Sequence, residues 1–304
     1  MIRIQKFKTT SCLLLILLMI QGLVSLCLAE EMNTSTSSTL KESTPKALTV
    51  KPTITLEDKS IKSYLAQRDE QWNKLLEKNH FLKGEKLVYN ISWGFINAGV
   101  ARMETKLLPD KKILHQSHAH AYDALQSIYP VFDTITTLMQ GPDLLPNEFY
   151  KITNEGGYHS RTRVVYDQLL GQAVMGDSIL NGKGKVKKQR DTTVTLDGPS
   201  HSITSAFVLI RTLDLRPKET YEFYAVSGKK KYKLKVIAHG YETIEVGDKK
   251  YKCLRVEPVL DEDGLFQSKG KLNIWITRDK RKLPVLVRSK IAIGSIELEL
   301  ISHK

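Results

Sequence analysis

The stretch that decides the fold is KGKLNIWITRDKRKLPVLVR, residues Lys269–Arg288. Apolar Leu272, Ile274 and Ile276 recur at every second position, which places them on one face of a β-strand. Trp275 stands between two polar residues on the other face. A charged segment follows, and LPVLVR begins a second apolar run, so the pattern predicts an antiparallel hairpin. We expect this hairpin to be wall or scaffold, with its charged tip forming a turn.

Similar short segments recur from residue 84 onward, separated by Asn, Gly or Asp about every ten residues. The expected strands are 85–94, 97–108, 112–122, 131–139, 160–168, 220–226, 231–239, 242–247, 251–259, 271–278 and 285–302. Many short alternating strands predict an all-β body built as an antiparallel curved sheet or a barrel-like structure. A sheet of this size closes or rolls to avoid exposed edges, so we expect an interior cavity.

Two segments have helical rather than alternating spacing. Residues 59–80 carry an apolar stripe opposite charged residues, which predicts an N-terminal amphipathic helix capped by Ser60 or Asp58. Its stripe consists of Ile61, Tyr64, Leu65, Trp72, Leu75 and Leu76. Residues 197–215 contain Pro199 followed by apolar residues at helical spacing, which predicts one internal helix lying on or plugging the sheet.

The first 29 residues have the plan of a secretory signal peptide. Three basic residues precede the apolar run Cys12–Ile20, and Ala29 stands just before two acidic residues. This order predicts cleavage after Ala29 and export, most simply to a periplasm. Lipidation is disfavoured because Leu26, not a small residue, precedes Cys27. An uncleaved anchor is the other alternative, since residues 12–29 approach the length that spans a bilayer.

The rest of the chain divides into three parts. Residues 30–58 are rich in Ser and Thr without periodicity, which predicts a disordered tether. The amphipathic helix at 59–80 follows, and residues 81–304 form the expected β-rich domain. Cleavage after Ala29 would leave Cys253 as the only cysteine, so an internal disulfide is excluded and the core must hold the domain. Its alternating surroundings predict a half-buried apolar position for Cys253.

The chain of 304 residues is basic, with a formal charge of +13 that falls to +10 without the predicted signal peptide. Two clusters, at 181–190 and 228–235, carry much of the excess. They are either solvated loops and strand faces or surfaces that attract anionic lipid head groups or envelope polymers. Nucleic acid is not expected, because aromatic residues do not interleave with the first cluster.

No recognisable catalytic or metal-binding motif accompanies this pattern. His118 and His120 share one strand face and His115 lies on the other, without a third ligand at metal-binding spacing. Asp177 and Ser178 occur in a Gly-Asp-Ser triplet, but no histidine follows an aspartate at the spacing that esterases of this class need. We interpret that pair as turn residues. The sequence predicts no catalytic, cofactor-binding or metal-binding residues.

Five blocks of sequence, at 84–105, 129–139, 145–167, 202–217 and 270–300, resemble the bacterial family known as domain of unknown function 3108. The resemblance runs from Phe81 to Ile301 and is strongest at Gly-Glu-x-Leu-x-Tyr (84–89), at Leu-Ile-Arg (209–211) and at 275–294. It implies an exported, β-rich protein and supplies no activity. At matching positions, we expect Gly99 to allow close strand approach and Pro284 to limit pairing at an edge.

Six residues are candidates for internal polar pairs or ligand contacts. Five are polar side chains within apolar patterns, and the sixth is an indole whose N–H needs a partner. They are Asp133, Glu155, Arg161, Arg211, Asp279 and Trp275. We expect some of them to pair inside the barrel or at its mouth, either as structural ion pairs and caps or as ligand contacts.

The combined pattern leaves three functions open. The first is a non-catalytic envelope domain that binds an apolar or amphiphilic, lipid-like ligand, with basic loops facing a membrane surface. The second is a protein-interaction module that supports envelope assembly. The third and weakest is a hydrolase whose site the sequence does not reveal, which a buried carboxylate pair in a cleft would favour.

Overall fold

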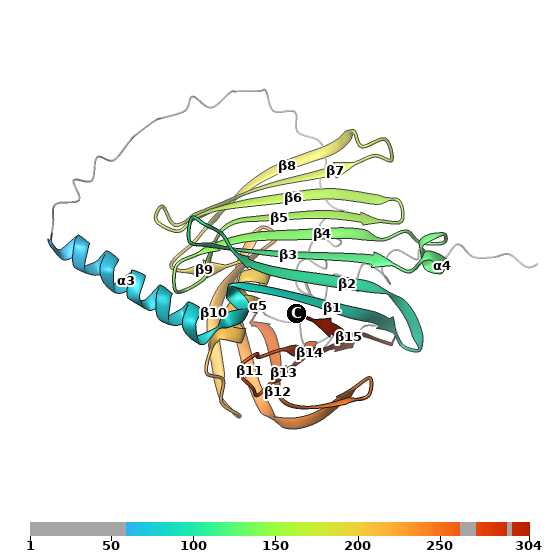
Figure 1. Ribbon diagram of the computed structural model, residues 1–304. Helices are drawn as coiled ribbons and strands as arrows, with labels where there is room; N and C mark the ends of the chain where they lie inside the picture. The colour runs from blue at the N-terminus through green and yellow to red at the C-terminus, as the bar shows by residue number, and fades with distance from the viewer. Residues whose placement is uncertain (1–58, 262–271, 291–293) are drawn as a thin grey trace, which may run out of the picture.

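The computed structural model of the protein describes residues 59–261, 272–290 and 294–304 (Figure 1). The signal peptide and tether predicted at residues 1–58 lie outside the described residues. In the described part of the chain, fifteen strands join one sheet in the order β8-β7-β6-β5-β4-β3-β2-β1-β15-β14-β13-β12-β11-β10-β9. All neighbouring strands are antiparallel except β9 and β10, which are parallel.

The strands alternate between buried and exposed side chains over most of their length, which is the reason they form a sheet with one face on a core. Their bounds are β1 Gly84–Trp93, β2 Ile96–Leu107, β3 Lys112–Ala121, β4 Phe132–Gln140, β5 Leu145–Glu155, β6 Tyr158–Asp167, β7 Gln172–Leu180, β8 Val186–Thr195, β9 Ser200–His201, β10 Thr220–Ser227, β11 Lys230–Val246, β12 Lys249–Asp261, β13 Leu272–Thr277, β14 Pro284–Lys290 and β15 Ser295–His303.

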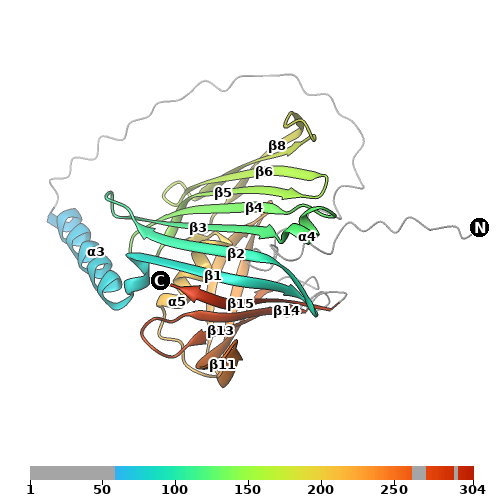
Figure 2. The same cartoon turned by 45° about the vertical axis from the view of Figure 1, so that its right-hand side comes forward.

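The sheet is strongly curved (Figure 2), and its two end strands, β8 and β9, are not paired with each other. Val226 of β10 packs with the apolar cluster of β6–β8, which includes Val164 and Met175. The Gln168 side chain, after β6, donates to and accepts from the backbone of Ser200 in β9. These contacts bring the two edges together through side chains. The predicted all-β body is therefore confirmed as a curved, unclosed, barrel-like sheet.

The internal helix is α5 (Ile203–Thr212), and it lies against the inner face of the sheet. The Ser202 hydroxyl accepts from the Ser205 N–H at 3.0 Å, and the Ser205 hydroxyl accepts from the Ser202 N–H, which completes a capping box. Ala206 and Ile210 join the main core. The helix is thus shorter than the predicted segment 197–215. It begins after Ser202, whose side chain caps a free N–H group of the first turn.

The N-terminal helix is α3 (Lys59–Lys78), and apolar residues of its second half pack on the body. Trp72 and Leu76 are buried with the 3-10 turn η2 (His80–Leu82), whereas Tyr64 and Leu65 are exposed. A short helix that the sequence did not predict, α4 (Asp123–Gln126), connects β3 to β4. Among the described residues, no helix has both the length and the apolar composition to cross a membrane.

Four of the described strands escaped the sequence analysis, and one predicted turn is wrong. The strands are β5, β7, β8 and the two-residue β9. Of these, β8 begins at Val186, inside the basic cluster at 181–190. Asp177 and Ser178 are not turn residues, because they lie within β7, paired with Arg190 and Gln189 of β8. Their polarity reflects the solvated end of the sheet. The predicted strands at 231–239 and 242–247 are one long strand, β11, with an irregularity between Ala238 and Tyr241.

The opening hairpin is confirmed as β13 and β14, but it is buried on both faces. Ile274 pairs with Val256 and Val287, and Trp275 on the opposite face is also buried. The prediction that Pro284 limits pairing at an edge is wrong. Pro284 begins β14 between β13 and β15, and its carbonyl oxygen accepts the buried Tyr89 hydroxyl at 2.8 Å.

Candidate functional site

Strand register identifies which side chains share the inner face of the sheet. Ala101 pairs with both Tyr89 and Ala119, and Ala119 pairs with Asp133 of β4. Directly paired residues point to the same side of a sheet. Asp133 therefore shares a face with the buried core residues of β1, β2 and β3. On β5 the same face carries Lys151, because it pairs with the buried Ile135.

Two carboxyl groups meet at the end of β4 and β5, and we call Asp133 and Glu155 the acid pair. Their residues are 0% and 2% exposed. The Asp133 carboxylate oxygen Oδ1 accepts the Asn154 N–H at 2.6 Å. The other oxygen, Asp133 Oδ2, has no partner among the described groups, and neither has Glu155 Oε2 or Thr153 Oγ1. Three buried oxygens without a protein donor thus cluster on a few residues of one face.

The acid pair retains a proton at neutral pH. Burial, then the neighbouring Asp133 charge and a hydrogen bond to Asp133, raise the pKa of Glu155 to about 8. Burial also raises the pKa of Asp133, against the hydrogen bond from Asn154 and the pull of Lys151. Like charges this close cannot both be ionised at low cost. We assign the shared proton to the pair rather than to one oxygen.

Lys151 and Tyr129 complete the electrostatic surroundings of the acid pair. Burial lowers the pKa of Lys151, against the attraction of Asp133, Glu155 and Asp177. Burial, and then the two acids, raise the pKa of Tyr129. The Tyr129 ring covers Gly156, where an added Cβ would lie 2.7 Å from the ring. The site therefore combines a carboxyl pair that shares one proton, one amine and one phenol beside apolar side chains.

This arrangement can exchange hydrogen bonds with a polar group but carries little net charge. The protonated acid can donate, and the free oxygens of the pair can accept. No group of three or more His, Cys, Asp or Glu side chains among the described residues is arranged to hold a metal ion. The chemistry of the site is that of hydrogen-bonded recognition, with a proton available for transfer.

Arg211 is buried elsewhere, in an ion pair that the sequence analysis did not identify. Its guanidinium donates to both Glu85 oxygens at 2.6 and 2.7 Å and to the Lys282 carbonyl at 3.0 Å. It also lies 3.9 Å from the centre of the Phe81 ring. These contacts join α5 to β1, to η2 and to the tip of the opening hairpin. Each of the three guanidinium nitrogens of Arg211 thus donates a hydrogen bond within the protein.

Trp275 also has its expected partner, but on the face opposite the acid pair. Its indole N–H donates to Glu242 Oε2 at 2.7 Å, and the other Glu242 oxygen accepts Arg255 Nε at 2.7 Å. Ile274, one residue earlier, pairs with Val287 on the inner face. The indole therefore packs between the opening hairpin and β11, which covers it.

The remaining two candidates are exposed. Arg161 pairs with Ile152 on the outer face of β6. Asp279 lies in the turn after β13, where it accepts Arg281 Nη2 at 2.6 Å and the Thr277 hydroxyl at 3.1 Å. The hydrogen bond to Arg281 is the main reason for its lowered pKa. The structure thus brings together only Asp133 and Glu155, and ligand contact stays a prediction for all six residues.

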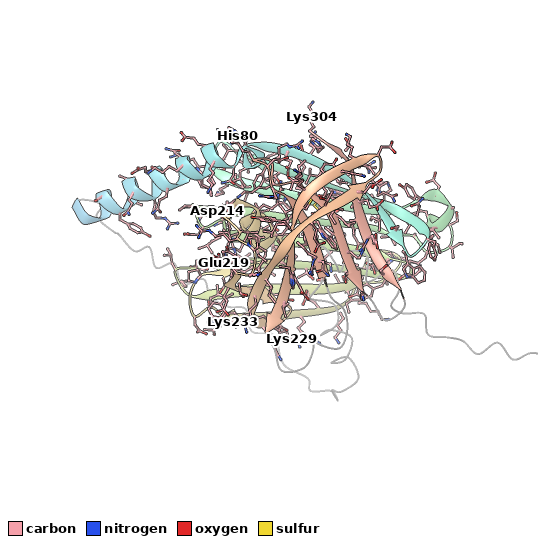
Figure 3. All side chains as sticks on the ribbon, turned by 90° about the horizontal axis from the view of Figure 1, so that it is seen from below. His80, Asp214, Glu219, Lys229, Lys233 and Lys304 are labelled. Atoms are coloured by element: carbon pink, nitrogen blue, oxygen red, sulfur yellow. The ribbon has the colours of Figure 1, made fainter. Side chains whose placement is uncertain are left out.

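The hairpin tip also borders a groove of about 660 Å³ on the outer surface, which we call the basic groove. It lies between the β11–β12 turn, the β13–β14 turn and the end of β15, near Lys304 in Figure 3. Its basic lining residues are Lys249, Lys250, Lys252, Arg278, Arg281 and His303. The groove lies at the end of the sheet opposite the acid pair.

The other residues singled out from the sequence have structural surroundings. His115 is fully buried beside the Thr105 hydroxyl at 3.0 Å, and burial lowers its pKa to about 3. His118 is exposed on the other face, as its spacing predicts. Cys253 is completely buried, and burial, with Asp279 and Glu242 adding to it, raises the pKa of its thiol to about 12. The thiol is therefore protonated and shielded.

Lys151, Thr153 and Tyr129 were missed by the sequence analysis. A signal for two of them exists, because FYKITNE (149–155) alternates and puts Lys151, Thr153 and Glu155 on one face. The strand was overlooked since polar residues occupy the face that normally carries the apolar half of the pattern. Polar residues at every second position of a strand, on the face that lines the interior, are the sequence pattern that indicates this site.

The sequence matches the family described as "Protein of unknown function (DUF3108)" over residues 88–301. No curated protein matches it significantly. A beta-barrel-like DUF1849 protein from Brucella abortus is 11% identical, with 73% of this chain and 98% of that chain covered and a TM-score of 0.49. The Pseudomonas aeruginosa MucA/MucB complex contains a chain 8% identical, with 76% and 94% covered and a TM-score of 0.17. Similarity this remote transfers no function.

Proposed function

The chain belongs to the DUF3108 family of proteins of unknown function, and we propose that it is a non-catalytic envelope protein whose inner sheet face binds an amphiphilic, lipid-like ligand. Family membership supplies no reaction, so the proposal rests on the site. The predicted signal peptide supports an exported, periplasmic location. The proposed binding position is the acid pair with Lys151 and Thr153.

One observation carries this proposal: apart from the proton that Asp133 and Glu155 share, three oxygens near the acid pair are buried without a donor among the described residues. More than nine in ten buried polar groups in native proteins are hydrogen-bonded, because an unpaired one costs about 1–3 kcal/mol. The shared proton can serve the acid pair internally, and a bound polar head would supply hydrogen bonds to the oxygens that remain without a partner, including Thr153 Oγ1. Ligand binding would then remove the free-energy cost of burying these oxygens without hydrogen bonds.

The charge and apolar surroundings of the site narrow the ligand class. Glu155 holds a proton at neutral pH, and the attraction between Asp133 and Lys151 opposes the effect of burial on the pKa of each group. A site close to neutral favours an uncharged or zwitterionic head with hydroxyl donors over a multiply charged anion. Val131 and Ile135, both buried beside the acid pair, favour an apolar tail. We therefore propose an amphiphile with a hydroxyl-bearing head.

The two basic clusters contribute differently to an envelope role. In the cluster at 228–235, Lys231 pairs with Asp197 and Lys233 pairs with Glu222, at 2.7 Å each. Lys229 lies in the turn between β10 and β11, and Lys233 lies in the first part of β11 (Figure 3). The cluster at 181–190 is exposed instead. We therefore attribute the proposed attraction to anionic surfaces to the cluster at 181–190.

Native mass spectrometry of the protein purified gently from its own host tests the proposal. We expect a stoichiometric amphiphile, which solvent extraction releases and identifies. Asp133→Asn and Glu155→Leu should reduce its occupancy by about tenfold, the effect of one lost hydrogen bond to a buried partner. Glu148→Gln is the matched control, because Glu148 lies on the outer face of β5, bonded to Arg163.

Thermal unfolding of each variant separates loss of ligand from loss of fold. The proposal fails if the folded wild-type protein carries no amphiphile in repeated preparations. It also fails if Glu148→Gln lowers occupancy as much as the two inner-face variants do. An amphiphile that is consumed during incubation would instead indicate the hydrolase alternative.

A protein-interaction module is the second candidate function, and α3 favours it. Tyr64 and Leu65 continue the apolar stripe of this helix but are exposed, which leaves an apolar surface that a partner could cover. Crosslinking in host cells through a photoreactive residue at position 64 tests this candidate. A partner captured at 64, with no amphiphile in the native mass spectrum, would replace the ligand-binding proposal.

A further inference from the structure

Four connections lie at one end of the sheet, which we call the α4 end. Successive antiparallel strands run in opposite directions, so the β1–β2, β3–β4, β5–β6 and β7–β8 connections share an end. Figures 1 and 2 both show them along one margin of the sheet, next to α4. Neighbouring connections are two strands apart, or about 10 Å along the sheet.

Large apolar side chains are exposed at the tips of the α4 end. Phe95 in the β1–β2 turn is fully exposed, and Ile128 beside α4 is 80% exposed. Ile96, Phe132 and Tyr158 are also exposed. They come from three of the four connections, so they form a row of apolar tips. Such a group on the surface marks an interaction site, since single exposed apolar residues are ordinary but a gathered set is not.

The fourth connection at this end is basic. Lys183, Lys185, Lys187 and Lys188 are exposed around the β7–β8 turn, and none pairs with a carboxylate of the described chain. Asn181 fixes the turn, because its side-chain oxygen accepts the N–H groups of Lys183 and Lys185 at 3.0 Å each. The lysines therefore project from an ordered turn beside the apolar tips.

We propose that the α4 end docks on an anionic lipid bilayer. Phe95 and Ile128 enter the boundary between head groups and acyl chains, and the four lysines contact anionic head groups. Both halves of the interaction are needed, because apolar tips alone would bind neutral bilayers equally well. The partner is thus a phospholipid surface with negative charge.

This docking rests on the proposed function and names the source of the ligand. Asp133 follows the exposed Phe132 directly, and Glu155 is the last residue of β5 at the same end. A bilayer seated on the α4 end would therefore lie next to the acid pair. An amphiphile leaving that bilayer would reach its proposed site without crossing the length of the sheet.

The opposite end supplies the matched control. Leu169 and Leu170 in the β6–β7 turn are 99% and 72% exposed. Their N–H groups donate to the Asp167 carboxylate, which puts an acid rather than lysines at that turn. Similar apolar area is thus available at this turn beside a carboxylate, whereas the basic groove of the same end is formed by other connections, those of β11–β12 and β13–β14.

Vesicle co-sedimentation tests the proposal, using the processed protein purified from its host. We expect binding to phosphatidylglycerol–phosphatidylethanolamine vesicles and little binding to phosphatidylcholine vesicles. Phe95→Ser with Ile128→Ser should lower the affinity by about tenfold or more. Replacing the four lysines by Gln should lower it by about fivefold per lysine, and added salt should mimic this change. Leu169→Ser with Leu170→Ser should leave it unchanged.

A fluorescent reporter tests the same contact without relying on affinity. Phe95→Trp should shift its emission to the blue when anionic vesicles are added, whereas Leu169→Trp should not. The proposal is overturned if the lysine and apolar-tip variants bind vesicles as the wild type does, or if the Leu169 and Leu170 variant loses as much. An amphiphile found by native mass spectrometry in protein that ignores vesicles would keep the proposed function and remove this inference.

Discussion

Arg211 shows how one buried charge connects distant parts of the chain. Glu85 is the second residue of β1, Arg211 lies in the last turn of α5, and the Lys282 carbonyl belongs to the opening hairpin, yet all three meet within hydrogen-bond distance. Moving two charges out of water costs about as much as their attraction returns. The pair therefore contributes less to net stability than to the position of α5 against the sheet.

Removing only the carboxylate should be strongly destabilising. Glu85→Gln leaves the Arg211 charge buried without a counter-charge, so we expect a loss of about 3–5 kcal/mol in the free energy of unfolding. Urea denaturation measures this change. Glu70→Gln is the control, because the Glu70–Lys74 pair on α3 is exposed to solvent and contributes little to stability. Equal effects in both variants would contradict a structural role for the buried pair.

Glu155 should make the protein less stable as the pH rises. Its pKa is raised from an ordinary 4.5 to about 8 in the folded state, so the folded protein binds the extra proton between these values. The stabilisation is complete below pH 4.5 and is lost as the pH rises to about 8. Glu155→Gln keeps the protonated shape and should remove this dependence.

Denaturation of wild type and Glu155→Gln from pH 5 to 9 measures the difference. Asp133, Lys151 and Tyr129 also titrate around the site, and taking the difference between the two proteins reduces their contribution. We expect the Gln variant to gain on the wild type steadily as the pH increases. A constant difference across this range would mean that Glu155 does not hold its proton in the folded state.

At the scale of elements, Gly99 controls how closely β2 and β3 approach. A Cβ at this position would lie 2.2 Å from the His120 carbonyl oxygen and 3.1 Å from the Ala121 Cα. Both contacts are with backbone, which cannot move without breaking the strand pairing. The predicted close approach at Gly99 is thus confirmed.

Gly99→Ala should therefore cost on the order of 3 kcal/mol or more, a large effect for one methyl group. Gly157→Ala is the control, because no atom lies within 4 Å of a Cβ there and its φ is not positive. Thermal unfolding of the two variants measures the contrast. Comparable melting temperatures would show that β2 and β3 can separate slightly without loss.

Strands and helices with one apolar face were predicted well from the sequence. Strands in which neither face is apolar were predicted poorly. Strands such as β1 and β12 alternate clearly, and α5 has apolar residues at helical spacing. In contrast, β8 reads VKKQRDTTVT and exposes most of its side chains, so its pattern resembles a loop. Such a strand is held by backbone pairing with β7, and pairing between distant residues leaves no periodic signal.

The composition of the candidate site could not be predicted for the same reason, because it depends on how distant parts of the chain pair. Asp133 and Glu155 were both singled out as polar residues in apolar patterns, but their contact depends on the turn between β4 and β5 and on strand register. Trp275 was singled out on the same grounds and lies on the opposite face. A sequence indicates which side chains are unusual, whereas register decides which of them meet.

The curved sheet separates a tightly packed region from a weakly packed one. The opening hairpin contributes to the largest cluster of buried residues, together with α5 and strands from both ends of the sequence. Strands β6–β8 share a much smaller cluster with Val226. In addition, β8 has a neighbour on only one side. The β7–β8 hairpin should therefore open in local fluctuations that leave the main core intact.

Hydrogen exchange followed by mass spectrometry measures that difference. We expect amides of β8 to exchange orders of magnitude faster than those of β14, which lies between two paired strands and is buried on both faces. The basic turn would then sit on the part of the sheet most able to adjust to a lipid surface, and anionic vesicles should slow exchange there. The control is the β6–β7 turn, whose exchange should not respond to vesicles. Equal exchange rates in β8 and β14 would mean that the sheet opens as one unit, and that local adjustment of the β7–β8 hairpin has no part in binding.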